Sequence, residues 1–323
     1  MKSKIFVISL VIVVALLFGC TASTQQKELK IGFITTPESA LVQVAQDKAF
    51  FEQQDLNVSL EKFTAGKLAL QAFLAGNLDM AVVGEVPVAL ARMQGNNFYV
   101  LAQIATCPGE NPVLVHGKNI VDVKTYFASA KRKLATSIGG TPEFYTYNFL
   151  NYYGIDANQV EIVAQSPSDM PAAFVSGSVD AISVFEPYPT IAENQLNGET
   201  TRLEIPREMY SPKYILVANK KWVDNNPQEA ESLIKALIQA QKYVAANPTE
   251  SKQIVAKMSG FDPKLIQSVW GKCLMQVELN DSLLQTWAAE SVWAIETKKV
   301  DKNAVTDFES MLRKDLLSAA NAS

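Results

Sequence analysis

Two stretches of the chain share the pattern F-x-x-G-x-x-D-x-x-x-V-x-E, and each ends on an acidic side chain. The first stretch ends at Glu85 and the second at Glu186. A carboxylate accepts hydrogen bonds, so these glutamates suit an amine, amide or hydroxyl group of a ligand. A Thr-Pro-Glu triplet precedes each stretch, at Thr36 and at Thr141. The two matches predict two similar units, each presenting one glutamate at the end of the repeated stretch and one helix N-terminus.

The residues within each stretch predict how its glutamate is positioned. An apolar helix ends at Gly76 or Gly177, where glycine can adopt a positive φ. The apolar run that follows, at residues 80–83 or 181–184, is too short for a helix and suits a strand buried on both faces. Each glutamate then falls just past the carboxyl end of a strand, which is where open α/β sheets bind ligands.

The helix N-termini offer the opposite chemistry. A threonine caps each predicted helix, and free N–H groups in the first turn suit an anion such as a sulfonate, phosphate or carboxylate. Gly139 and Gly140, just before the second of these helices, allow a ligand to approach the backbone closely. Nearby aromatic rings offer apolar walls. The candidate ligand-binding residues are Thr35, Thr36, Gly84, Glu85, Gly140, Thr141, Phe144, Glu186 and Tyr188.

Each acidic residue also has a purely structural interpretation. Glu38 and Glu143 lie in first helical turns, where glutamate complements the helix dipole. Glu85 and Glu186 precede prolines that begin helices and would serve those helices in the same way. The repeat itself could be a chance similarity between two generic helix–strand segments.

Strands alternate with helices through both units, which predicts parallel-rich sheets with crossover connections. From Lys221 onward the sequence predicts only helices, which pack most simply on the first unit. The fold class is therefore a two-lobed α/β fold. Lobe 1 comprises residues 29–112 and 217–323, and lobe 2 comprises residues 113–216. Two extended crossings, one near Pro112 to His116 and one near Tyr214 to Ala218, would form the hinge between them.

The N-terminus predicts export. Two lysines precede an apolar run that is too short to span a bilayer and that suits a secretory signal peptide, residues 1–20. The run ends in Leu-Phe-Gly-Cys, which resembles a bacterial lipobox and would leave Cys20 as an acylated first residue. Residues 21–28 form a polar tether. The alternatives are an ordinary signal peptide and an uncleaved anchor.

Composition and motifs argue against several functions. The 323 residues are 48% hydrophobic and 19% charged, with a net charge of −4 and no large basic block, which disfavours a nucleic-acid partner. His116 is the only histidine, and no catalytic, phosphate-binding or metal motif is present, so we expect neither an enzyme nor a cofactor or metal. Export would permit a disulfide between Cys107 and Cys273, but their spacing leaves the pairing open.

Several motifs together resemble one family. They are Leu29-Lys-Ile-Gly-Phe, Ala69 to Asp79, Gly84-Glu-Val-Pro87, Phe149 to Ile155, and Pro171 to Ala181 running into Glu186-Pro-Tyr188. In this order and spacing the chain resembles solute-binding proteins of ABC importers, of the nitrate/sulfonate/taurine and thiamine-pyrimidine-precursor type. The likeness covers residues 29–219 well and the helical C-terminal third less well. Gly-Gly-Thr-Pro-Glu stands where many sulfonate binders have a serine-rich turn.

The resemblance implies a periplasmic-binding-protein fold (type II) that closes on a small ligand and delivers it to an ABC permease and ATPase complex. The expected ligand is an organosulfonate such as a taurine-like compound, or alternatively a pyrimidine-type vitamin precursor. The expected protein is a monomeric lipoprotein of the cell envelope, held at the membrane by its N-terminal lipid. A ligand-sensing module not tied to transport is a further alternative.

Overall fold

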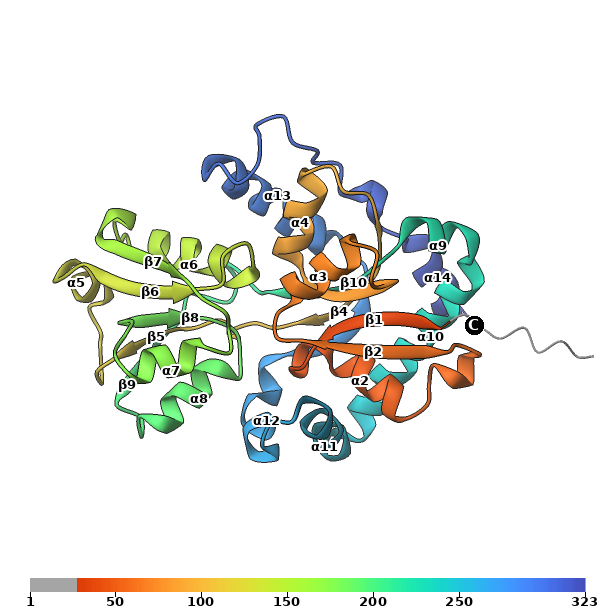
Figure 1. Ribbon diagram of the computed structural model, residues 1–323, viewed down its shortest axis with the longest axis horizontal. Coiled ribbons are helices and arrows are strands. Elements are labelled where there is room, and N and C mark those ends of the chain that lie inside the picture. The colour runs from red at the N-terminus through yellow and green to blue at the C-terminus, as the bar shows by residue number, and fades with distance from the viewer. Residues whose placement is uncertain (1–27, 323) are drawn as a thin grey trace, which may run out of the picture.

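The computed structural model describes residues 28–322, which form two lobes joined by extended segments (Figure 1). Each lobe is a β-sheet with helices packed on it, so the predicted two-lobed α/β fold is confirmed. The predicted signal peptide, Cys20 and residues 21–27 of the tether lie outside the described residues. No helix within residues 28–322 is both long and apolar enough to cross a membrane.

Lobe 1 is built on a six-stranded mixed sheet. Its strands are β1 (Leu29–Ile34), β2 (Val58–Phe63), β3 (Met80–Gly84), β4 (Tyr99–Thr106), β10 (Lys213–Ala218) and β11 (Leu274–Glu278). They lie in the order β11-β4-β10-β3-β1-β2. β1 pairs in parallel with β2 and β3, whereas β10 is antiparallel to both β3 and β4. Every residue of β3 is buried, as predicted for a strand covered on both faces.

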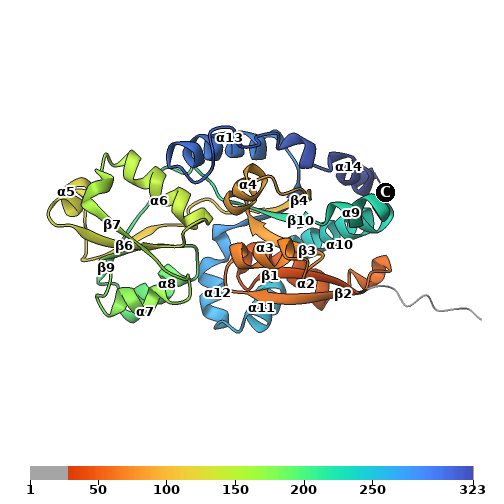
Figure 2. The same ribbon diagram turned by 45° about the horizontal axis from the view of Figure 1, so that its top comes forward.

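Helices cover both faces of this sheet. They are the 3₁₀ turn η1 (Pro37–Ser39) and the helices α2 (Ala40–Asp47), α3 (Gly66–Leu74), α4 (Glu85–Met93), α9 (Lys220–Asn225), α10 (Pro227–Ala246), α11 (Pro248–Ser259), α12 (Pro263–Val269), α13 (Asp281–Glu296) and α14 (Lys314–Ala322). The C-terminal helices pack mainly on lobe 1, and α12 also touches α8 (Tyr188–Gln195) of lobe 2. Figure 2 shows α13 lying along α4, on the side of lobe 1 that meets lobe 2.

Lobe 2 repeats the plan with five strands. They are β5 (Val113–His116), β6 (Arg132–Thr136), β7 (Val160–Ala164), β8 (Ala181–Ser183) and β9 (Thr200–Leu203), in the order β7-β6-β8-β5-β9. Its helices are α5 (Val123–Ala128), α6 (Thr141–Tyr152), α7 (Met170–Val175) and α8 (Tyr188–Gln195). β6 pairs in parallel with β7 and β8, and β5 joins in antiparallel register.

The sequence repeat is a structural repeat. Gly76 and Gly177 both follow a helix and have φ values of +81° and +74°, as predicted. The carboxylate of Asp79 accepts a hydrogen bond from the backbone N–H of Lys30 in β1, at 3.0 Å. The carboxylate of Asp180 accepts the corresponding bond from the N–H of Lys133 in β6, at 2.8 Å. The repeated aspartate thus ties the turn before each central strand to the start of the neighbouring strand.

The C-terminal third differs from the prediction in two places. Residues 274–278 form β11 at the edge of the lobe 1 sheet, where only helices were predicted. A disulfide between Cys107 and Cys273 joins the residue after β4 to the residue before β11, and answers the open question of their pairing. The last helix begins at Lys314 rather than at Asn303, because a loop and a short 3₁₀ turn occupy the intervening residues.

The chain crosses between the lobes at residues 107–112 and 204–212. All six residues of β10 pair within the lobe 1 sheet, so the predicted boundary between residues 216 and 217 falls inside a strand. The second crossing therefore ends before Lys213. β1, β3 and β4 run parallel to one another, and their carboxyl ends lie on the side of lobe 1 that faces lobe 2.

Candidate functional site

Three helices begin at the gap between the lobes. α3 and α4 start from lobe 1 and α6 starts from lobe 2. The residues before them are Ala65, Gly84 and Gly140, none of which has a side chain that bonds to the first turn. Free backbone N–H groups and the positive ends of the helix dipoles therefore converge on one gap. That arrangement suits an anion.

The gap is small because the lobes are in contact. A Cβ atom built on Gly84 would lie 2.4 Å from Oγ1 of Thr141, so any other residue here would force the Thr141 hydroxyl or the lobes to move. The space that remains is about 20 Å³. It has room for about one water molecule, so a small organic ligand requires the lobes to separate. The gap is lined by Ile34, Ala65, Gly66, Lys67, Gly84, Pro87, Ser137, Gly140, Thr141, Pro142, Phe185 and Tyr214.

Lysine contacts bridge the two lobes around this gap. Nζ of Lys67, in the first turn of α3, donates a hydrogen bond to the carbonyl of Ile138 in lobe 2 at 2.8 Å. Nζ of Lys299, which follows α13, forms an ion pair with the carboxylate of Glu143 in α6 at 2.6 Å. Lys67 also places a positive charge beside the three helix starts. The closed arrangement is thus held partly by charges at the rim of the gap.

Glu85 lies in the first turn of α4 and is fully buried. Its carboxylate accepts hydrogen bonds from the hydroxyl of Tyr210 and from the backbone N–H of Lys213, both next to or in the second crossing. Burial raises the pKa of Glu85, and these bonds oppose the increase. The carboxylate does not line the gap. A direct role in ligand binding stays a prediction, and its observed contacts anchor the crossing segment.

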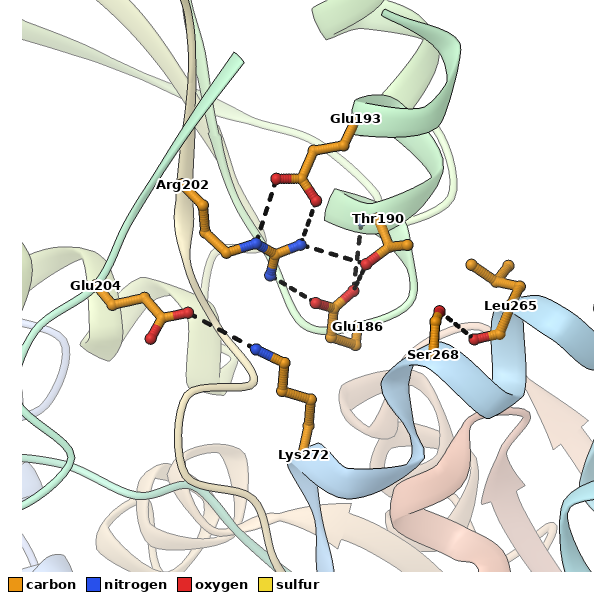
Figure 3. A network of polar contacts seen from close by, with 8 residues as sticks. All are labelled: Glu186, Thr190, Glu193, Arg202, Glu204, Leu265, Ser268 and Lys272. Carbon is orange, nitrogen blue, oxygen red and sulfur yellow. Dashed lines mark hydrogen bonds and ion pairs between the residues drawn. The ribbon is translucent and has the colours of Figure 1, made fainter. Parts of the chain in front are cut away.

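Glu186 is buried within lobe 2, at the centre of the network in Figure 3. Nη1 of Arg202 lies 2.6 Å from its carboxylate, and the hydroxyl of Thr190 donates to the same carboxylate at 2.8 Å. The other guanidinium nitrogens of Arg202 bond to Glu193. Arg202 was not singled out from the sequence, because nothing local marks a strand arginine as the partner of a glutamate sixteen positions earlier. A ligand that used Glu186 would have to replace these bonds.

The remaining sequence-predicted residues fall into two groups. Gly84, Gly140 and Thr141 line the gap. Among the others, Thr35 is half-buried, Phe144 packs on Trp293 with ring centroids 5.1 Å apart, and Tyr188 packs on Phe185 with centroids 5.6 Å apart. Neither threonine acts as the predicted cap, because the hydroxyl of Thr36 makes no such bond and Thr141 is already the first residue of α6.

A second group of polar side chains is buried beside the gap. Glu38 follows β1 and Glu110 follows β4, so both lie past the carboxyl ends of lobe 1 strands. The side chains are fully buried, and burial raises the pKa of Glu38 to about 7. Burial, followed by the charge of Glu38, raises the pKa of Glu110 well above its usual range. The hydroxyl of Tyr214, whose ring lines the gap, donates to Glu110 at 2.6 Å.

Sequence reasoning missed Glu110 and Lys67 and assigned Glu38 only a helix-dipole role. Two signals were available. Glu110 belongs to the Cys-Pro-Gly-Glu-Asn-Pro stretch that interrupts the strand–helix alternation at the first crossing, and Gly66-Lys67 opens a helix directly after a strand. Among residues 28–322, the only grouped set of potential metal ligands is Cys107, Glu110 and Cys273. The disulfide removes both thiolates from that set.

Comparison with known proteins gives a consistent picture. The profile of the NMT1-like family matches residues 22–260. A Bacillus subtilis (strain 168) protein, named for binding aliphatic sulfonates, is 27% identical over 313 residues, covering 91% of each chain. The taurine-binding periplasmic protein of Escherichia coli (strain K12) is 24% identical over 242 residues, covering 73% of this chain and 74% of that protein.

Solved structures share the fold. The alkanesulfonate-binding protein SsuA from Xanthomonas axonopodis pv. citri, bound to MOPS, superposes with a TM-score of 0.76 at 18% identity, covering 88% of this chain and 97% of that chain. The desulfurization enzyme DSZB superposes with a TM-score of 0.71 at 12% identity, covering 92% and 99%. The fold therefore carries both binding proteins and at least one enzyme.

Proposed function

Because this chain belongs to the NMT1-like family, we propose that it is the substrate-binding component of an ABC importer and captures a small organic sulfonate between its lobes. The observation that carries the proposal is the convergence of three helix starts, without side-chain caps, on the gap between the lobes. Lys67 adds a positive charge there. The curated relatives named for sulfonates and taurine support the choice of a sulfonate among anions.

The proposed mechanism is closure of the lobes on the ligand. A ligand favours the closed state only if it makes contacts there that it cannot make in the open state. The helix starts come from both lobes, so one anion can contact all three only when the lobes are close. Rim contacts such as Lys67 to Ile138 would then form only in the closed state. The closed shape is what an importer's permease would recognise.

Catalysis is not part of the proposal. The ring Nε2 of His116 donates a hydrogen bond to the carbonyl of Phe174 at 2.9 Å, and the imidazole stacks on the Phe174 ring, so this histidine has a structural role inside lobe 2. The relation to DSZB rests on fold alone, at 12% identity. Export is supported by the predicted signal peptide and by the disulfide. We further propose attachment through a lipidated Cys20, and a monomeric protein in solution.

A thermal-stability screen tests the proposal. The mature protein would be heated with alkanesulfonates, aminoalkanesulfonates, nitrate, pyrimidines and flavins at millimolar concentration. Binding at about 100 times the dissociation constant stabilises the folded state by about 2.7 kcal/mol, which is readily measured. The proposal predicts that a sulfonate gives the largest increase. If only pyrimidines or flavins stabilise the protein, its ligand belongs to that alternative class and not to the sulfonates. Turnover of a sulfonate would contradict a purely binding role.

A further inference from the structure

Two buried carboxyl groups share a hydrogen bond beside the gap. Glu38 follows β1, and Glu110 lies in the first crossing between the lobes. Their side chains are at most 1% exposed and bond to each other. An ionised carboxylate can only accept hydrogen bonds, so two carboxyl groups can share one only if one of them carries a proton. The closed arrangement of the lobes therefore holds at least one proton in this pair.

No cation takes the place of this proton. Within residues 28–322, no lysine, arginine or histidine forms an ion pair with Glu38 or Glu110, and Arg202 is already paired with Glu186. The sulfur of Cys273, which lies 3.9 Å from Glu110, belongs to the disulfide and does not titrate. The titratable side chains that face the pair are Glu85, Tyr210 and Tyr214, together with Glu186 and Tyr188 of lobe 2.

Lobe 2 completes the burial of the pair. Glu38 belongs to lobe 1, whereas Tyr188 begins α8 of lobe 2. The ring of Tyr188 packs edge-on against Phe261 of lobe 1, with ring centroids 6.2 Å apart. Burial, followed by the charge of Glu38, raises the pKa of Tyr188 to about 12, so these two side chains lie close together across the lobe contact. Separation of the lobes would remove this cover and admit water to the pair.

The closed state binds a proton at this pair more tightly than the open state does. Burial is the main cause that raises the pKa of Glu38 to about 7 and the pKa of Glu110 well above its usual range. Hydration in the open state would bring both pKa values back toward 4.5. A state that binds protons more tightly is favoured at low pH, so acid favours closure and a rise in pH through about 7 favours opening.

The position of the pair connects this proton to the gap. Tyr214 lines the gap with its ring and donates a hydrogen bond from its hydroxyl to Glu110. The closed gap has only about 20 Å³ of space, so a ligand can enter only after the lobes separate. We propose that the proton shared by Glu38 and Glu110 locks the lobes together in the ligand-free protein, and that its release to solvent opens the gap for ligand entry. This inference requires lobes that open and close, and does not require the ligand to be a sulfonate.

X-ray scattering from the ligand-free protein tests the proton lock. The radius of gyration of the wild type is expected to increase between about pH 5 and about pH 8, as the ratio of open to closed molecules rises by about 100-fold. The double variant Glu38→Gln/Glu110→Gln retains a donor and an acceptor at each position but has no proton that titrates. Its radius of gyration should stay at the closed value over the same range of pH.

Glu290→Gln is the matched control. Glu290 in α13 and Glu85 in α4 form a second buried pair of carboxyl groups that share a hydrogen bond, but both helices belong to lobe 1. Opening of the lobes does not uncover this pair, so the control should open with pH as the wild type does. If the double variant does not fold, infrared spectroscopy of Glu290→Gln provides the test. The absorption of a protonated carboxyl group should disappear with the same pH midpoint as the opening measured by scattering.

The outcomes separate this inference from the proposed function. A radius of gyration that does not change with pH, or that changes equally in the wild type and the double variant, overturns the proton lock. Opening whose midpoint differs from that of the carboxyl absorption also overturns it. No ligand is present in these measurements, so none of these results bears on sulfonate binding. Failure of every sulfonate in the thermal-stability screen would in turn leave the lock intact.

Discussion

The two Thr-Pro-Glu turns occupy equivalent places in the two lobes and have opposite surroundings. Each follows the first strand of its parallel pair, β1 in lobe 1 and β6 in lobe 2. In lobe 2, Glu143 accepts a hydrogen bond from the N–H of Gly139 at 2.7 Å and pairs with Lys299 at 2.6 Å. In lobe 1, Glu38 is fully buried, and its carboxyl group shares a hydrogen bond with the buried carboxyl group of Glu110 rather than with a cation.

The difference shows how one repeated unit serves two purposes. A glutamate bonded to its own turn and to the opposite lobe stabilises the structure as it stands. A buried carboxyl group with no cation beside it costs stability when it ionises. The backbone plan has been retained in both lobes, while the side-chain environments have diverged. The glutamate of the lobe 2 turn pairs with a lysine of lobe 1, whereas the glutamate of the lobe 1 turn lies against a second buried carboxyl group.

The largest expected effect is on the pH dependence of stability through Glu38. Its pKa is raised from 4.5 to about 7 in the folded protein, so folding favours the protonated carboxyl. That stabilisation is complete below about pH 4.5 and is lost as the pH rises to about 7. The Glu38→Gln variant has no carboxyl group at this position, so it does not lose this stability as the pH rises. We expect the unfolding free energy of the variant relative to wild type to rise by about 3 kcal/mol between pH 4 and pH 8, measured by urea unfolding without ligand.

Glu143→Gln is the matched control for that experiment. It replaces the bonded glutamate of the lobe 2 turn and removes a partly exposed ion pair, so its effect should be below about 1 kcal/mol. Equal pH profiles for the two variants would show that the turns do not differ as described.

An effect of comparable size, on ligand affinity, is expected from a substitution at the contact between the two lobes. Gly84→Val introduces a side chain whose Cβ atom would lie 2.4 Å from Oγ1 of Thr141, and so blocks closure. The affinity for the sulfonate found in the stability screen should fall by about 100-fold, because the closed state becomes inaccessible. Gly271→Val is the control, since a Cβ atom on Gly271 would have no neighbouring atom within 4 Å. Unchanged affinity in Gly84→Val would place the ligand elsewhere.

The repeat predicts smaller and similar effects in both lobes, with a minor additional loss in lobe 2, where Asp180 also pairs with Arg132 at 3.3 Å. Asp79→Asn and Asp180→Asn each weaken a hydrogen bond to the first residues of a neighbouring strand. Each should lower the free energy of unfolding by about 1 kcal/mol, because a charge-assisted bond becomes a neutral one. Urea unfolding measures both. A large effect in one lobe and none in the other would show that the repeat is only a sequence similarity.

The smallest expected effect on ligand affinity comes from the ion pair between Lys299 and Glu143 at the edge of the gap. Lys299→Ala removes the ion pair with Glu143 that bridges the lobes, and the affinity for ligand should fall about two- to fivefold. Lys302→Ala, an exposed lysine three positions further along the chain, is the control. Calorimetry measures both variants. An increase in affinity on removing Lys299 would mean that this contact opposes ligand capture.

The fold could be predicted largely from the sequence because it depends on local patterns. The positive φ of Gly76 and Gly177, the buried β3 and the two lobes all followed from residue types and periodicity. β11 was not predictable in this way, because a five-residue edge strand is defined by its pairing with β4 and by a disulfide partner 166 positions away.

The site was harder to predict because side-chain partners are set by tertiary contacts. Glu85 and Glu186 stand at strand ends as expected, yet Tyr210 and Arg202 reach them from distant parts of the chain. Glu38 looked like an ordinary first-turn glutamate, and only its burial beside Glu110 distinguishes it. Sequence patterns placed the backbone and could not determine which carboxylates already had partners.

The most direct test is a crystal structure of the protein with 2-aminoethanesulfonate. We predict that the sulfonate will lie within hydrogen-bond distance of backbone N–H groups at the starts of α4 and α6. A ligand bound outside the gap between the lobes, or bound there with its sulfonate away from these helix starts, would contradict the account.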